Sequence, residues 1–248
     1  MAALAIERLL QRREEDKVFG LGSGMTILQR RLALSGAILR DQPIERLIAL
    51  GPRGTVLLYL RGDKSRISLP ADRTGEPLPS VEERLRQAAS VVHNHPVNEG
   101  RPIGGTFSVS DITLAERLEM AELCVVAVEA TYTLRPAPGF AWHAGWVTGT
   151  ENAYARTRAS LERAMMASPQ LSKQRDIYFF LRTYDFLMLQ LAKRCHMVYQ
   201  REDQPPEGWR DRIPMVMPVK RNPPSTSLLD DTAHFRWLAR IIARALPS

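Results

Sequence analysis

Two histidines and a serine–aspartate pair are the residues of this sequence best suited to chemistry. His93 and His95 lie two residues apart in VVHNHP, and Ser108 and Asp111 lie three residues apart in FSVSD. Side chains at positions i and i+2 of a β-strand point to the same face, so both histidines can reach one ion. Two imidazoles and one carboxylate suit zinc and leave a fourth position for water, which then loses a proton near neutral pH. The pattern predicts a hydrolytic zinc site.

The elements that must position these residues can be predicted on both sides of them. Residues 90–93 are apolar and predict a strand that ends at the histidines, with a helix over residues 81–89 before it. Ser108 opens a helical pattern that places its apolar residues on one face. The other expected elements are helices over 3–18 and 25–39, a β-hairpin over 44–60, a strand at RISLP (66–70), and strands over 123–130 and 131–136.

This order of elements predicts an α/β (α+β) fold with a mixed β-sheet flanked by helices. We expect an N-terminal helical segment (1–40), a core domain (41–150) and a mainly helical C-terminal extension (151–248). Within the extension, helices are expected over 151–167, 174–200 and 228–246, separated by a segment rich in loops and proline.

Composition excludes several classes of protein. The 248 residues are 44% hydrophobic, which is ordinary for a globular chain, and no apolar run approaches the roughly 20 residues that span a bilayer. The first residues become charged too early for a secretory signal, and two distant cysteines give no disulfide framework. We therefore expect a cytoplasmic protein that does not bind membranes, with a leaderless secreted effector as the alternative.

The net charge of +7 is compatible with binding to nucleic acid, an anionic membrane or an acidic protein partner. Acidic residues are interspersed throughout, and no basic block with interleaved aromatic residues stands out, so a solvated basic surface is the favoured interpretation. The sequence does not indicate the oligomeric state.

The motif H-x-H-P followed by S-x-x-D resembles the JAMM (JAB/MPN) metalloproteases, in particular the bacterial and phage-associated JAB-like and RadC-like branches. The resemblance covers roughly residues 43–146 and implies the cytidine deaminase-like JAB/MPN fold. It also implies Zn²⁺-dependent cleavage of a peptide or isopeptide bond, on a protein or peptide substrate such as a ubiquitin-like conjugate or a protein tail.

Carried over residue by residue, the resemblance makes His93, His95 and Asp111 the zinc ligands. Ser108 would stabilise the oxyanion, and Glu45, at the start of the first core strand, would be the general base. One departure is the long segment 96–107 between the second histidine and the serine, which we interpret as a rim beside the cleft.

Other interpretations of the same residues, including purely structural roles, stay open. Ser108 and Asp111 also fit a capping box, and Glu76 is a substitute for Glu45 as the base. His143, Cys195-His196 and His234 are expected to pack rather than to bind metal. Two other functions also remain open: a RadC-like nucleic-acid-associated protein and a non-catalytic MPN-type protein-interaction module.

Overall fold

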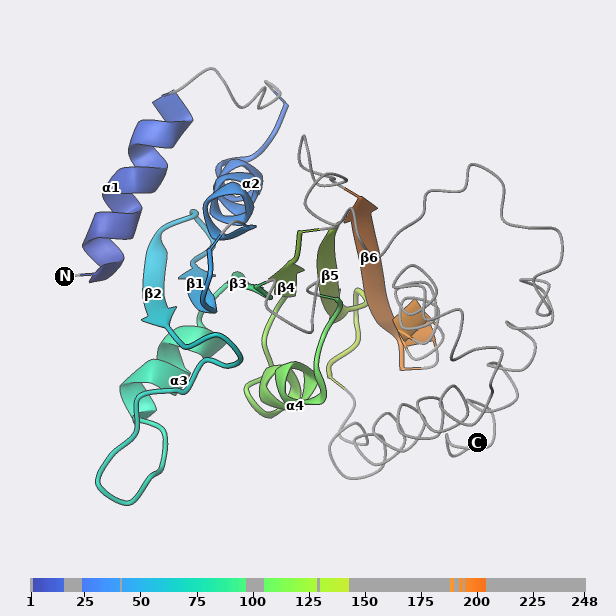
Figure 1. The fold of residues 1–248 in the computed structure, drawn as a ribbon. Helices are drawn as coiled ribbons and strands as arrows, with labels where there is room; N and C mark the ends of the chain where they lie inside the picture. Colours follow the sequence, from blue (N-terminus) through green and yellow to red (C-terminus); the bar gives the residue numbers. More distant parts are fainter. Residues whose placement is uncertain are drawn as a thin grey trace, which may run out of the picture.

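The computed structural model describes residues 2–15, 24–40, 42–96, 105–128, 130–142, 188–189, 192–193 and 195–203 (Figure 1). Helices and strands are interspersed along this part of the chain. In order, the elements are α1 (Ala2–Glu15), α2 (Ile27–Arg40), β1 (Arg46–Leu50), β2 (Val56–Arg61), α3 (Pro79–Arg86), β3 (Ser90–Asn94), α4 (Val109–Arg117), β4 (Leu123–Val126), β5 (Ala130–Pro136) and β6 (Met197–Asp203).

The six strands form one mixed sheet in the order β2-β1-β3-β4-β5-β6. β3 and β4 run parallel, whereas every other neighbouring pair is antiparallel. The predicted mixed sheet with flanking helices is therefore confirmed. All five residues of β3 are buried, because this strand lies inside the sheet and has helices on both sides.

The hairpin of β1 and β2 is also confirmed. Its turn is closed by a hydrogen bond from the Gly51 amide to the Thr55 carbonyl, at 2.8 Å. Gly54 in this turn has a φ of +74°, and a Cβ there would lie 2.8 Å from the Cγ of Arg31 in α2. Both the left-handed backbone and the close approach of α2 require glycine at this position.

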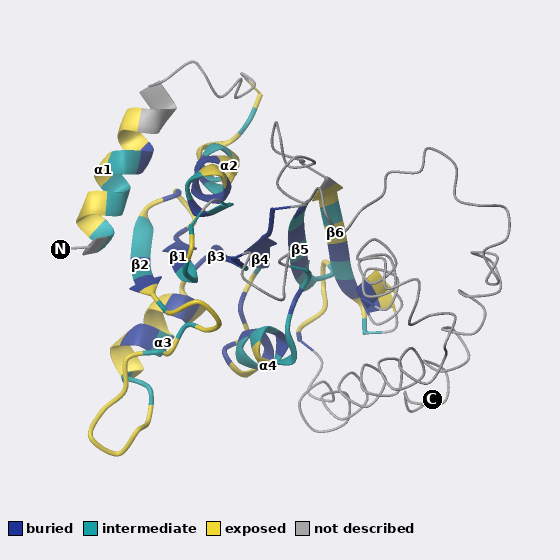
Figure 2. Cartoon of the chain, in the orientation of Figure 1, coloured by how far each residue is buried: buried dark blue, intermediate teal, exposed yellow. Residues whose placement is uncertain are grey.

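Alternation along the strands divides the buried residues between the two faces of the sheet (Figure 2). On one face, α1 and α2 complete an apolar cluster made of Leu10, Leu34, Leu39, Ile48, Leu50, Val92, Cys124 and Val126. The other face packs against α3 and α4, and its cluster includes Leu47, Ala49, Leu85, Val91, Ile112, Ala115, Val125 and Leu134.

Two sequence predictions about strands are wrong. Residues 66–70 form no strand. The segment follows a turn in which the Asp63 amide donates to the Arg66 carbonyl, and none of the described strands pairs with it. Conversely, the end of the helix expected over 174–200 is strand β6, because residues 197–203 pair with the whole of β5. The helices expected over 151–167 and 228–246 lie outside the described residues.

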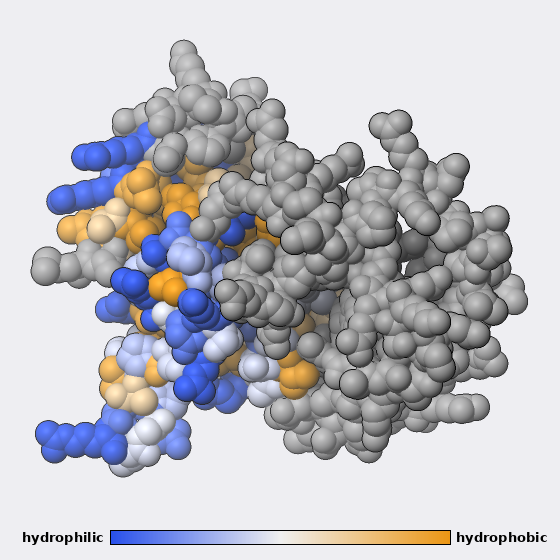
Figure 3. All heavy atoms as spheres, in the orientation of Figure 1, coloured by the Kyte–Doolittle hydropathy of each residue, from blue (hydrophilic) through white to orange (hydrophobic). Residues whose placement is uncertain are grey.

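The hydropathy of the surface differs between the N-terminal helices and the loop between β2 and α3 (Figure 3). Hydrophobic surface gathers over the N-terminal helices, where Leu4 and Ile27 are each about half exposed. The loop between β2 and α3 is hydrophilic. No helix within the described ranges is both long and apolar enough to cross a membrane.

Candidate metal centre

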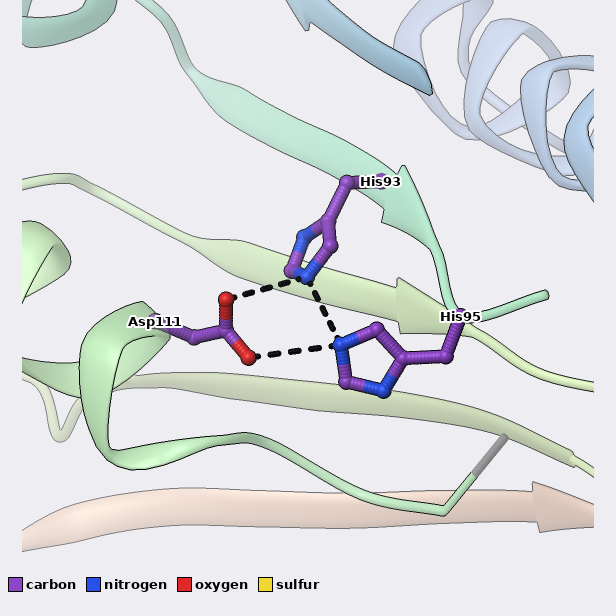
Figure 4. A group of neighbouring side chains, drawn as sticks. All are labelled: His93, His95 and Asp111. Carbon is purple, nitrogen blue, oxygen red and sulfur yellow. Dashed lines mark hydrogen bonds and ion pairs between the residues drawn. The ribbon is translucent and has the colours of Figure 1, made fainter. Parts of the chain in front are cut away.

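The two histidines lie at the end of β3 and point to the same side of the sheet (Figure 4). β3 ends at Asn94, but the His95 amide still donates to the Val126 carbonyl of β4, at 3.0 Å. This hydrogen bond keeps His95 in line with the strand, so the alternation of side chains continues through it. The two Nε2 atoms lie 3.2 Å apart, with His93 almost completely buried.

Asp111 approaches the histidines from the first turn of α4. Its Oδ1 lies 3.2 Å from Nε2 of His93, and its Oδ2 lies 3.4 Å from Nε2 of His95 (Figure 4). The ligand atoms of all three residues lie within 4.8 Å of one another, so this group could hold a metal ion. The spacing rule for strands and the S-x-x-D motif thus predicted three side chains that the fold brings together.

The capping box at the start of α4 holds Asp111 in place. The Ser108 hydroxyl accepts a hydrogen bond from the Asp111 amide at 3.2 Å, and Asp111 Oδ2 accepts one from the Ser108 amide at 2.6 Å. The alternative interpretation of this pair as a cap is therefore confirmed. It does not compete with metal binding, because the cap aims the carboxylate at the histidines.

The histidines and the carboxylate stabilise one another electrostatically. Burial raises the pKa of Asp111, but the adjacent His93 and His95 outweigh it and hold that pKa well below its usual range. For His95, burial lowers the pKa, yet the hydrogen bond and charge of Asp111 leave it raised overall. The carboxylate is thus ionised and ready to bind a cation.

The loop before α4 orients the imidazole of His95. Nδ1 of His95 lies 3.3 Å from the carbonyl oxygen of Gly105, which can only accept a hydrogen bond. With the proton on Nδ1, a neutral His95 presents the lone pair of Nε2 to the position between the three side chains. Backbone carbonyls commonly orient metal-binding histidines in this way.

Glu45 lies next to this group. In the antiparallel register, Leu47 is paired with His93, so counting two residues further sets Glu45 opposite His95. Burial raises the pKa of Glu45, and the two imidazoles oppose that effect. Glu76, the substitute considered for it, is exposed in a separate turn around Asp72.

These residues line one cleft of about 360 Å³. Its apolar lining comes from β1, β3, α4 and β4 and from the loops beside them, including Ile67 and Leu69 after β2. Its polar lining includes the hydroxyls of Ser65, Thr106, Ser108 and Ser110. Ser108 Oγ also lies 3.3 Å from Ser110 Oγ. The full set is Glu45, Leu47, Lys64, Ser65, Arg66, Ile67, Leu69, Val91, His93, His95, Pro96, Thr106, Ser108, Ser110, Asp111, Leu114, Met120 and Leu123.

Sequence reasoning missed Asn94, the residue between the two histidines. Its side chain is fully buried; Oδ1 accepts from the Arg46 amide at 2.7 Å, and Nδ2 donates to the Ile44 carbonyl at 3.0 Å. These two bonds fasten the backbone on both sides of Glu45 to the strand that carries the candidate ligands. An amide residue enclosed by two candidate ligands was the available signal.

The remaining candidates behave as packing residues where they are described. Cys195 packs at the edge of the main apolar cluster, and the ring of His196 stacks on Phe140 with centroids 4.3 Å apart. His143 and His234 lie outside the described residues, as does most of the 96–107 rim. No protein-family model, curated protein or solved structure matches this chain.

Proposed function

We propose that this protein is a zinc-dependent hydrolase of the JAMM type that cleaves a peptide or isopeptide bond. The observation that carries this proposal is the convergence of His93, His95 and Asp111 with the partly buried carboxyl group of Glu45 in one cleft. The JAB/MPN fold belongs to the same proposal. It is supported by a mixed sheet in which the H-x-H-P motif ends an inner strand and the S-x-x-D motif caps the next helix.

The spacing of the ligand atoms favours zinc. Zinc binds histidine nitrogen and carboxylate oxygen at about 2.0–2.1 Å in a tetrahedron, whose edges are then about 3.3–3.4 Å long. The two Nε2 atoms lie 3.2 Å apart, Asp111 Oδ1 lies 3.2 Å from Nε2 of His93, and Asp111 Oδ2 lies 3.4 Å from Nε2 of His95, so each of these contacts is close to the length of such an edge. Two nitrogen donors and one oxygen donor would occupy three corners and leave the fourth open to the cleft.

When bound, zinc supplies Lewis-acid chemistry: it polarises a carbonyl and acidifies water. The chain's own residues would do the rest. Glu45 would accept a proton from the attacking water on a carboxylate oxygen and pass it to the leaving amine. The raised pKa of Glu45 suits this exchange, because a carboxyl group whose pKa lies closer to neutral pH both accepts and releases a proton readily.

Ser108 would stabilise negative charge on the scissile carbonyl oxygen. Its Oγ lines the cleft and accepts a hydrogen bond from the Asp111 amide, which leaves its own hydroxyl hydrogen to be donated. A donor fixed by the capping box needs little reorganisation during the reaction, which is the condition for electrostatic stabilisation of an oxyanion.

Metal content is the first test. Elemental analysis of purified, zinc-supplemented protein should give about one zinc per wild-type chain, and none with His95→Ala or Asp111→Ala. His196→Ala is the matched control, because this histidine is exposed and stacks on Phe140 away from the candidate ligands. Absence of zinc from the wild type would contradict the proposal.

Catalysis is tested separately with Glu45→Gln. This variant should retain zinc and lose cleavage of peptide or ubiquitin-like test substrates by about 100-fold or more, the usual contribution of a general base. Unchanged cleavage would remove Glu45 from the mechanism. A zinc-bound wild type without cleavage, together with DNA binding that survives His93→Ala, would support the nucleic-acid-associated alternative instead.

A further inference from the structure

A short turn on the rim of the cleft carries two cations. Residues 62–67, here called the basic turn, follow β2 and contribute Lys64, Ser65 and Arg66 to the cleft lining. Lys64 and Arg66 are both exposed to solvent. The same cleft contains the carboxyl group of Glu45 and the candidate metal ligands.

The basic turn is tied directly to the backbone of Glu45. The Glu45 amide donates to the Asp63 carbonyl at 2.7 Å, and the Gly62 amide donates to the Glu45 carbonyl at 2.8 Å. Gly62 permits a very close approach, because a Cβ at this position would lie only 2.1 Å from the Arg66 carbonyl oxygen. The cations are thus positioned relative to the proposed general base.

Hydrogen bonds within the basic turn keep it in one conformation. Asp63 Oδ1 accepts from the Ser65 amide at 2.7 Å, from the Ser65 hydroxyl at 2.9 Å and from the Arg66 amide at 3.0 Å. The Asp63 amide also donates to the Arg66 carbonyl at 3.0 Å. A preformed turn loses little entropy when a ligand binds to it.

The charges of the cleft favour an anionic ligand. Its lining contains two cationic side chains, Lys64 and Arg66, and two carboxylates, Glu45 and Asp111. A bound Zn²⁺ would add two positive charges, so the metal-loaded lining is net positive. Arg66 is only loosely paired with Asp63, through Nε at 3.8 Å, and both side chains are well exposed.

We propose that the basic turn selects substrates that carry a carboxylate close to the scissile amide, with Lys64 and Arg66 as the specificity-determining residues. This inference rests on the proposed hydrolase function of the same cleft. The carboxylate belongs either to an aspartate or glutamate side chain or to the C-terminus of the substrate. Arginine and lysine both bind carboxylates through charge-assisted hydrogen bonds.

The test measures binding and cleavage in the same samples of the full-length, zinc-loaded protein. The probes are fluorescein-labelled octapeptide pools with glutamate, glutamine or lysine at one position, which is moved along the peptide. A further pair of pools has either a free or an amidated C-terminus and separates the two sources of the carboxylate. Fluorescence anisotropy reports the affinity, and mass spectrometry reports cleavage.

Wild-type protein should bind the best glutamate pool, or the free C-terminus, about three- to tenfold more tightly than its neutral counterpart, since exposed pairs contribute modestly. The preference should shrink as salt is added. Lys64→Gln/Arg66→Gln should abolish it, and Arg66→Glu should turn it toward the lysine pool. Arg73→Gln is the matched control, because Arg73 is exposed on the neighbouring loop and is not part of the cleft lining.

Equal binding of charged and neutral pools by the wild type, or a preference that survives Lys64→Gln/Arg66→Gln, would overturn the inference. The same experiment distinguishes failure of this inference from failure of the hydrolase proposal. A carboxylate preference without cleavage of any pool would count against the hydrolase and leave the basic turn as a recognition site. Cleavage without a carboxylate preference would support the hydrolase and overturn the inference about the basic turn.

Discussion

The two faces of the central sheet are built from the same strands and serve different purposes. Val92 and Cys124 face α1 and α2, where they are sealed in an apolar cluster. Val91, His93 and Val125 face α3 and α4, and this side opens at the end of β3 into the cleft. Neighbouring residues of one strand therefore have different roles: one side chain packs in the apolar cluster, and the next faces the side that opens into the cleft.

Substitutions on the sealed face should change the free energy of unfolding without changing zinc binding. Leu34 of α2 is 1% exposed, so Leu34→Ala should lower the free energy of unfolding by about 2–5 kcal/mol through the cavity it leaves. Urea denaturation measures this loss. Zinc per folded chain should remain that of the wild type, and a loss of zinc binding in the folded variant would show that the two faces are coupled.

On the open face, His95 should control zinc binding and the stabilisation that zinc provides. His95→Ala should weaken zinc affinity by more than about 100-fold, because it removes one of three proposed ligands, whereas loss of a supporting residue costs 10–100-fold. Zinc should raise the melting temperature of the wild type and not that of the variant, since only a bound ligand stabilises the folded state. Calorimetry with and without zinc provides the measurement.

Asn94 links the end of β3 to the start of β1, next to Glu45. Asn94→Ala should lower the free energy of unfolding by about 1–3 kcal/mol, because it leaves the Arg46 amide and the Ile44 carbonyl without their buried partner. It should also reduce cleavage while zinc content is retained, since it frees the backbone around Glu45. Asn94→Asp keeps an acceptor for the Arg46 amide but sets a second acceptor against the Ile44 carbonyl, so it should also lower the free energy of unfolding. A wild-type cleavage rate in Asn94→Ala would contradict this role.

The smallest effect is expected at Cys124. Burial raises the pKa of this thiol to about 12, so only about one thiol in ten thousand is ionised at pH 8. Native protein treated with iodoacetamide at pH 8 should therefore remain unmodified at Cys124, whereas urea-unfolded protein should react fully. Peptide mass spectrometry distinguishes the two states. Rapid native labelling would show that the sealed face opens.

Local patterns predicted most of the sheet and the candidate ligands. Two apolar runs on either side of a turn predicted the hairpin of β1 and β2. The two-residue spacing of His93 and His95 predicted that their side chains point to the same side of the sheet. The capping signal at Ser108 located the start of α4, and with it the carboxylate of Asp111. Each of these features depends on residues close together in the sequence.

The errors arose where structure depends on distant partners. The residues of β6 alternate, with Met197 and Tyr199 buried, but a helical pattern before them hid that signal. Their strand exists because β5 offers a full edge for pairing. RISLP has strand-like composition but finds no such edge. Asn94 was missed because its importance lies in contacts with Arg46 and Ile44, almost fifty residues away.

The pairing of β6 has a practical consequence for anyone who produces the protein. A fragment that stops at residue 150, the end of the core expected from sequence, would lack the seven residues that pair with β5. Ala130–Pro136 would then be an open edge that can pair with another molecule. The fragment would also lack Tyr199, whose ring packs on those of Phe107 and Tyr132 beside the loop that leads to Ser108. Such a fragment should aggregate as its concentration rises, whereas the full chain should not.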